Sequence, residues 1–135
     1  DQRPNPEASG LLLQQKRYLF TADMKRRGIM KELATWAGKS KFKYRGSIEN
    51  GTTIIYGKGY SIIVTKEQYI SLLNHFRGKT VDAGTSKTDA PQGSVGKWLQ
   101  INVTKTAIAS YVCPILIVEG YAEGIGKSQL KFRRE

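Results

Sequence analysis

Residues 41–64 read KFKYRGSIENGTTIIYGKGYSIIV, and their pattern predicts a small β-sheet. Its first five residues alternate strictly between basic and aromatic side chains. On a β-strand, such alternation places the three cations Lys41, Lys43 and Arg45 on one face and the two aromatic rings on the other. The pattern therefore predicts a strand with one solvated basic face.

Two turn signals divide the rest of this stretch. Glu49-Asn50-Gly51 is typical of a tight turn, and Gly57-Lys58-Gly59 separates two β-rich runs at 52–56 and 60–64. We expect these runs to form a hairpin, or a small meander together with the preceding strand. The sheet is therefore expected to be antiparallel.

Helical patterns flank this sheet on both sides. Upstream, apolar residues recur at helical spacing over 22–37, and Gly38 is expected to end that helix. Downstream, Thr65 and Gln68 have the spacing of a capping box for a helix over 66–77. The fold class predicted is α+β, a small antiparallel sheet packed with several short helices from both halves of the chain.

The C-terminal half is less regular. Residues 84–93 offer nothing to bury and are expected to form a surface loop. Ser94 can cap a helix from Val95 to about Asn102, and a second helix is expected to begin near Lys105, capped by Thr104. That helix should end or kink near Pro114, where the ring removes a backbone donor. Residues 115–121 fit either a helix or a strand.

The length of 135 residues fits a single domain. We expect a flexible N-terminal segment over 1–10, one α+β domain over 11–126 and a basic C-terminal tail over 127–135. The one cysteine, Cys113, has apolar neighbours typical of a buried thiol, which favours a reducing cytoplasm. A nucleoid-associated or nuclear location is the corresponding expectation for a DNA-binding protein.

Charge is segregated along the chain. There are 22 Lys and Arg against 11 Asp and Glu, a net charge of +11. Residues 16–45 hold ten basic and two acidic side chains, net +8, and residues 127–135 hold four and one, net +3. Such clustering favours a polyanionic partner, DNA rather than RNA. A membrane is not expected, because the apolar face of 22–37 is needed for a small core.

Residues 94–113 read SVGKWLQINVTKTAIASYVC and resemble a helix-turn-helix unit. The resemblance implies a tight turn containing Asn102, and helices locked together by Ile101, Val103, Ile108 and Tyr111. Trp98 stands where the motif prefers a small residue, and Lys97 where it prefers an apolar one. The alternative interpretation is two ordinary core helices joined by a short turn.

The same resemblance implies that the second helix exposes Lys105, Thr106, Ala109 and Ser110 to a major groove. Phosphate contacts are expected from two further surfaces and from the tip of the hairpin. The candidate phosphate contacts are Lys25, Arg26, Arg27 and Lys31 on a helix face, Lys39, Lys41, Lys43 and Arg45 along the strand, and Lys58 at the hairpin tip. Phe42 and Tyr44 fit either base stacking or, as the favoured interpretation, core packing.

Nothing in the sequence assembles a catalytic or metal site. His75 is the one histidine and fits a cation at a helix C-terminus. We therefore expect a non-catalytic DNA-binding protein without a cofactor. The sequence is compatible with a homodimer. A DNA-binding module of a larger enzyme fits the same features. The alternatives are a metal-dependent nuclease, using Asp82 with Asp89 or Glu119 and Glu123 with Lys127, and an adaptor for an acidic protein.

Overall fold

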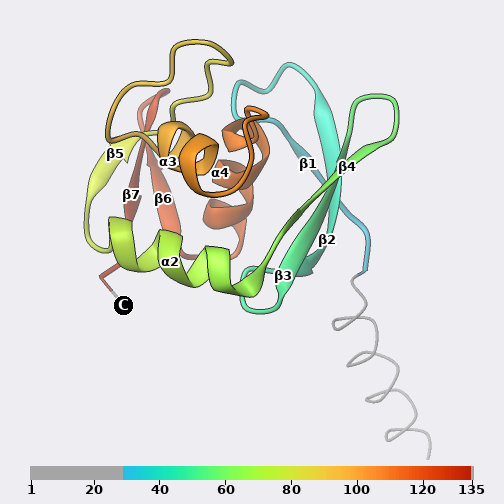
Figure 1. The fold of residues 1–135 in the computed structure, drawn as a ribbon, viewed down its shortest axis with the longest axis horizontal. Coiled ribbons are helices and arrows are strands. Elements are labelled where there is room, and N and C mark those ends of the chain that lie inside the picture. The colour runs from blue at the N-terminus through green and yellow to red at the C-terminus, as the bar shows by residue number, and fades with distance from the viewer. Residues whose placement is uncertain (1–28, 135) are drawn as a thin grey trace, which may run out of the picture.

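Two antiparallel sheets enclose a central helix in the computed structural model, which describes residues 29–134 (Figure 1). The predictions made for residues 1–28, among them those for Lys25, Arg26 and Arg27, lie outside this range. The elements are β1 (Lys31–Ala34), β2 (Lys41–Ser47), β3 (Gly51–Tyr56), β4 (Tyr60–Val64), α2 (Lys66–Phe76), β5 (Thr80–Asp82), α3 (Val95–Asn102), α4 (Ala109–Val118), β6 (Ala122–Ile125) and β7 (Gln129–Phe132).

The larger sheet has four strands in the order β1-β2-β3-β4, each antiparallel to its neighbour. The α+β class and the three-strand meander predicted over 41–64 are confirmed. Gly51 supplies a positive φ of 94° at the first turn, which asparagine followed by glycine favours. The sheet edge at β1 was not predicted.

The helix that follows the sheet begins as its sequence predicts. The Thr65 hydroxyl accepts the Gln68 N–H at 3.1 Å, and the Thr65 N–H donates to the Gln68 side chain at 2.8 Å. This reciprocal cap satisfies two donors at the start of α2. Leu72 and Phe76 then face the core, and Ser94 caps α3 in a similar way, accepting the Lys97 N–H at 3.1 Å.

The smaller sheet has the order β5-β7-β6, so the C-terminal strand lies in its middle. The predicted basic tail over 127–135 is therefore wrong in part, because residues 129–132 are a strand. Leu130 and Phe132 are buried while Lys131 between them is exposed. This is the same alternation that marks β2, over a shorter run.

The helix predicted over 22–37 is wrong for its last part, since residues 31–34 form β1. Leu33 of this strand pairs with Phe42 of β2 and is half-buried, whereas the other three residues of β1 are exposed. Pairing with β2 supplies the backbone hydrogen bonds that an isolated helix would have made for itself. Tertiary context here outweighs local propensity.

The second predicted helix begins at Ala109, not near Lys105, and residues 103–108 form an irregular connection. It runs to Val118 and passes through Pro114, where an end or kink was expected. Pro114 has no N–H for the Ser110 carbonyl one turn earlier. That carbonyl instead accepts the Trp36 N–H at 2.9 Å, so the loop after β1 replaces the missing bond.

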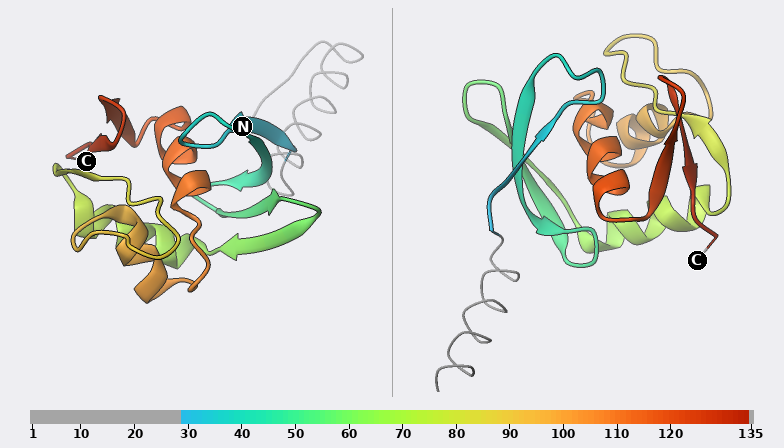
Figure 2. Two further views of the ribbon diagram at one scale, coloured as in Figure 1. Left: turned by 90° about the horizontal axis from the view of Figure 1, so that it is seen from above. Right: turned by 180° about the vertical axis from the view of Figure 1, so that it is seen from behind.

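The core lies between the two sheets, and α4 runs through it (Figures 1 and 2). Side chains from the four-stranded sheet, α2, α3, α4 and β7 all belong to one buried cluster. α4 is apolar nearly all round, with a sequence of ASYVCPILIV, as expected for a helix covered on several sides. Cys113 is fully buried there, as predicted.

Within residues 29–134, each helix falls short of the length and apolar character needed to cross a bilayer.

Candidate nucleic-acid interface

The outer face of the four-stranded sheet carries a column of three cations. Lys41, Lys43 and Arg45 are all exposed, whereas Phe42 and Tyr44 between them are 2% and 0% exposed. The predicted division of this strand into a basic and an aromatic face is therefore confirmed. The favoured interpretation of the two rings, core packing, is confirmed as well, so they are not free to stack on bases.

The neighbouring strands add uncharged side chains to this face, which we call the sheet face. Lys43 pairs with Ile55, and Arg45 pairs with Thr53, which in turn pairs with Ile63 of β4. The side chain of Ile63 is 66% exposed. Basic residues beside exposed apolar ones suit a nucleic acid, which offers phosphates and sugar or base surfaces together.

One carboxylate interrupts the sheet face. Glu32 of β1 is exposed and lies directly opposite Lys43 in the antiparallel register. The two side chains share a face, because directly paired residues of adjacent strands do so. Glu32 therefore reduces the positive potential at the centre of the cation column.

The half-buried carboxylate of Glu119 accepts hydrogen bonds from β2 and from the residue that follows it. The Tyr44 hydroxyl donates to the Glu119 carboxylate at 2.8 Å, and the Ile48 N–H donates to its other oxygen at 2.9 Å. Burial raises the pKa of the Tyr44 hydroxyl well above its ordinary value, and the hydrogen bond to Glu119 raises it further. Glu119 thus connects the end of α4 to β2.

Lys31 does not lie on the sheet face. It pairs with Tyr44, so its side chain shares the inward side of the sheet with that ring. Its ammonium group lies 5.0 Å from the centre of the Tyr44 ring and 4.0 Å from the Glu119 carboxylate. The structure therefore separates Lys31 from the other predicted strand cations.

The remaining predicted cations are spread over three connections. Lys39 lies in the β1–β2 connection, Lys58 at the tip of the β3–β4 hairpin, and Lys105 between α3 and α4; all three are exposed. Thr106 is exposed beside Lys105. The structure thus brings together Lys41, Lys43 and Arg45 on one strand face, with Lys39 and Lys58 on adjoining turns.

The predicted base-reading helix is largely covered. Ala109 is fully buried, which corrects its expected exposure, and Ser110 is half-buried with its carbonyl bonded to Trp36. Ile101, expected to lock the two helices together, is 71% exposed, and Asn102 ends α3 instead of forming a tight turn. α4 packs on the four-stranded sheet, where Tyr111 stacks on Tyr56 at 4.9 Å between ring centres.

Trp36 makes hydrogen bonds to two other parts of the fold. Besides its backbone bond to Ser110, its indole Nε1–H donates to the Lys127 carbonyl at 2.9 Å. Lys127 lies in the turn between β6 and β7. Trp36 therefore connects the β1–β2 connection to both α4 and the smaller sheet.

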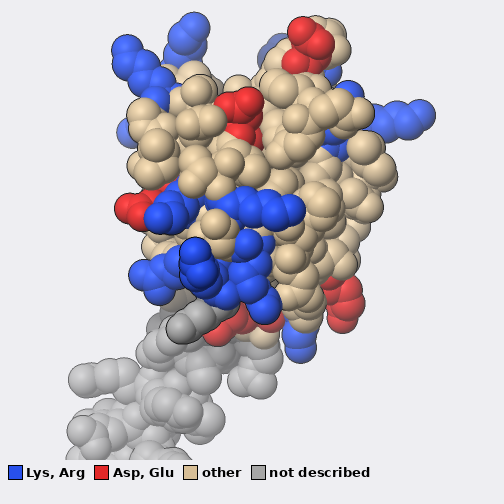
Figure 3. Space-filling model, turned by 90° about the vertical axis from the view of Figure 1, so that its left-hand side faces the viewer, with Lys and Arg blue, Asp and Glu red and all other residues tan. Residues whose placement is uncertain are grey.

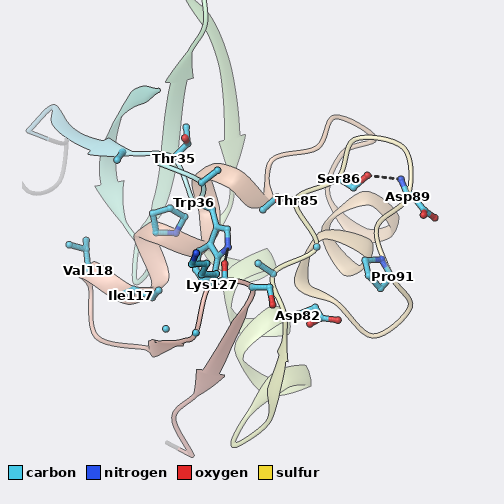
Figure 4. A pocket seen from close by; sticks show the side chains of 18 residues that line it. Thr35, Trp36, Asp82, Thr85, Ser86, Asp89, Pro91, Ile117, Val118 and Lys127 are labelled. Atoms are coloured by element: carbon cyan, nitrogen blue, oxygen red, sulfur yellow. Dashed lines mark hydrogen bonds between the residues drawn. The ribbon is translucent and has the colours of Figure 1, made fainter. Parts of the chain in front are cut away.

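A cavity of about 1160 Å³ opens beside Trp36, between α4, the β6–β7 turn and the loop after β5 (Figure 4). Asp82 and Asp89 both line it, as does Lys127. The two carboxylates project from different stretches of its rim, as Figure 4 shows. Among residues 29–134, no group of three or more His, Cys, Asp or Glu side chains is arranged to hold a metal ion.

The other carboxylates considered for a nuclease lie apart. The Glu119 carboxylate accepts a hydrogen bond from Tyr44 of β2, whereas Glu123 is exposed in β6, opposite Lys131. They do not share a helix face, because α4 ends at Val118. His75 lies in the last turn of α2, where its ring packs edge-on against Phe76.

A second group of exposed cations lies on the side of the molecule formed by the smaller sheet (Figure 3); the sequence analysis placed three of them in a basic tail and named none as a binding residue. This group consists of Arg77, Lys79, Lys131, Arg133 and Arg134. The run LKFR at 130–133 alternates as KFKYR does at 41–45, and this signal could have revealed a strand with an outward basic face.

Comparison of the chain with known protein families, curated proteins and solved structures returned no match.

Proposed function

We propose that the protein is a non-catalytic nucleic-acid-binding protein. It binds through the sheet face, and DNA is the preferred partner. The observation that carries the proposal is the exposed column of Lys41, Lys43 and Arg45 on one strand, next to uncharged side chains. Alternate residues of a strand are roughly 6.6 Å apart, so the three cations form a straight row. Such a row suits the regularly spaced charges of a nucleic-acid backbone.

Contacts of this kind give affinity and position but little sequence preference. Lys39 and Lys58 on adjoining turns extend the positive surface beyond the row. Because these side chains are exposed and flexible, they can approach phosphates without a change in the fold. Binding should therefore be strongly dependent on salt.

The helix pair of the predicted helix-turn-helix unit carries no part of this proposal. In helix-turn-helix proteins the second helix lies in the major groove. Here the corresponding helix, α4, is apolar and covered by the four-stranded sheet, so we assign no base contact to it.

The two alternatives have less support. A nuclease would use Asp82 and Asp89, which share the cavity beside Trp36, but two carboxylates on separate parts of a rim do not hold a metal ion closely. An adaptor for an acidic protein would use the same cations. It differs from our proposal in that no oligonucleotide would bind.

The test is a fluorescence anisotropy titration with duplex DNA, single-stranded DNA and RNA. The variants are K41A/K43A/R45A and the matched control K66A/K87A/K97A, which removes three charges from other elements. We expect the first variant to bind duplex DNA at least tenfold more weakly than the control. Equal binding by both variants would contradict the proposal, and Mg²⁺-dependent cleavage by the parent would favour the nuclease.

A further inference from the structure

The cations near the smaller sheet form a second basic surface at the opposite end of the molecule. We call Arg77, Lys79, Lys131, Arg133 and Arg134 the C-terminal basic face; all five side chains are exposed. They come from the end of α2, the segment before β5, and β7 with the two residues that follow it. Figure 3 shows Lys and Arg side chains gathered on this side of the molecule.

Backbone contacts hold these segments together. The Gly78 N–H donates to the Arg133 carbonyl at 3.0 Å, and the Phe132 N–H donates to the Lys79 carbonyl at 2.9 Å. The Arg134 side chain lies against Gly78. The five cations are thus brought together by the pairing of β7 with the α2–β5 connection, not by neighbouring positions in the sequence alone.

The surface is also hollowed. A groove of about 700 Å³ is lined by Lys131, Arg133 and Arg134, with Glu123 as its one acidic side chain. Three cations against one carboxylate make the groove attractive to an anion. Phosphates are the anions that rows of Lys and Arg recognise on a nucleic acid.

The two basic faces point away from each other. Phe42 and Tyr44 of β2 and Leu130 and Phe132 of β7 all enter the same core, so the alternate, charged residues of each strand face outward on opposite sides. Figure 2 shows the two sheets on either side of α4 in both views. A single straight duplex resting on one face therefore leaves the other face free.

We infer that the C-terminal basic face is a second phosphate-binding surface and that one chain bridges two nucleic-acid segments. This inference rests on the proposed function of the sheet face. It makes the protein a linker of DNA segments, a role that needs two positive faces on opposite sides and no base recognition.

The test is a capture assay in which a biotinylated duplex on beads retains a fluorescent duplex only when protein is present. We expect the parent and the control K66A/K87A/K97A to retain the fluorescent duplex. The variant K131A/R133A/R134A should still bind a single duplex in solution, within about threefold of the control, but retain at least tenfold less of the second. K41A/K43A/R45A should also fail to bridge.

The outcomes separate the two proposals. If the parent binds no duplex at all, the proposed function fails. If it binds one duplex but never retains a second, only the bridging inference is overturned. The inference is also overturned if K131A/R133A/R134A bridges as well as the parent. Sedimentation at the assay concentration then tests whether a dimer, in which each protomer uses its sheet face, bridges the two duplexes. Melting curves confirm that the variants fold.

Discussion

The backbone N–H of Trp36 donates a 2.9 Å hydrogen bond to the carbonyl of Ser110, which Pro114 leaves without its usual helical partner. The same residue bonds the β6–β7 turn through its indole nitrogen. Trp36 thus joins the larger sheet to α4 and to the smaller sheet, and it allows a proline inside a buried helix.

Replacing Trp36 tests this connection. Trp36→Phe removes the 2.9 Å bond to Lys127 but keeps most of the ring, and should lower the free energy of unfolding by about 1 kcal/mol. Trp36→Ala also removes packing against the core and should cost about 2–3 kcal/mol. Urea unfolding measures both. Trp36→Ala keeps the backbone N–H that bonds Ser110, so equal stability of this variant and the parent would show that the Trp36 side chain does not stabilise the connection.

Glu119 is expected to act in folding and not in catalysis. Glu119→Ala leaves the Tyr44 hydroxyl and the Ile48 N–H without their acceptor, and should destabilise the protein by about 3 kcal/mol. Tyr44→Phe removes one of the two bonds and should cost about half as much. Below the melting temperature, both variants should bind duplex DNA as the parent does. Weak DNA binding by fully folded Glu119→Ala would contradict this assignment.

We expect the buried Cys113 thiol to lower the free energy of unfolding at high pH. Burial raises the pKa of Cys113 far above its ordinary value of 9.0, so above that pH the native state retains a proton that the unfolded chain has released. The free energy of unfolding then falls as pH rises, by about 1.4 kcal/mol per pH unit for one such group. Tyr44 and Tyr69 add to the fall above their ordinary value of 10.0.

Cys113→Ala checks this directly. It should flatten the decline just above pH 9.0 while lowering stability at neutral pH by roughly 1 kcal/mol through the lost volume. Urea unfolding at several pH values measures the slope. An unchanged slope in the variant would assign the alkaline loss to other groups.

Glu32 should oppose DNA binding. Glu32→Gln removes the carboxylate opposite Lys43 on the sheet face and should strengthen duplex binding roughly threefold at low salt. The control Glu67→Gln makes the same change on α2, where it should have a smaller effect. Anisotropy titrations compare the two. A stronger gain for Glu67→Gln would place the binding surface elsewhere.

How much of the molecule could be predicted depends on how locally each part is determined. The meander over 41–64 and the caps at Thr65 and Ser94 were predictable, because turn chemistry and alternation act between near neighbours. β1 was not, because Leu33 fits either a helix or a strand until Phe42 pairs with it. The continuous course of α4 through Pro114 depends on Trp36, which is distant in sequence.

The candidate site divides in the same way. The basic column of β2 follows from its own alternation, and Lys31 was misplaced because its strand was taken for a helix. The burial of α4 depends on the sheet that covers it, which a motif over 94–113 does not reveal. The charge of residues 127–135 was predicted, but as a tail, because its cations meet Arg77 and Lys79 only when β7 pairs beside the end of α2.

The salt dependence of duplex binding shows whether the sheet-face cations contact phosphates. Affinities of the parent, K41A/K43A/R45A and K66A/K87A/K97A are measured by anisotropy over a series of salt concentrations. The logarithm of the association constant falls linearly with the logarithm of the salt concentration. If the three sheet-face cations each contact a phosphate, their removal should make this negative slope shallower by about 2 to 3, while the control keeps the slope of the parent. A sheet-face variant with the parent's slope and affinity would show that nucleic acid does not bind to the sheet face.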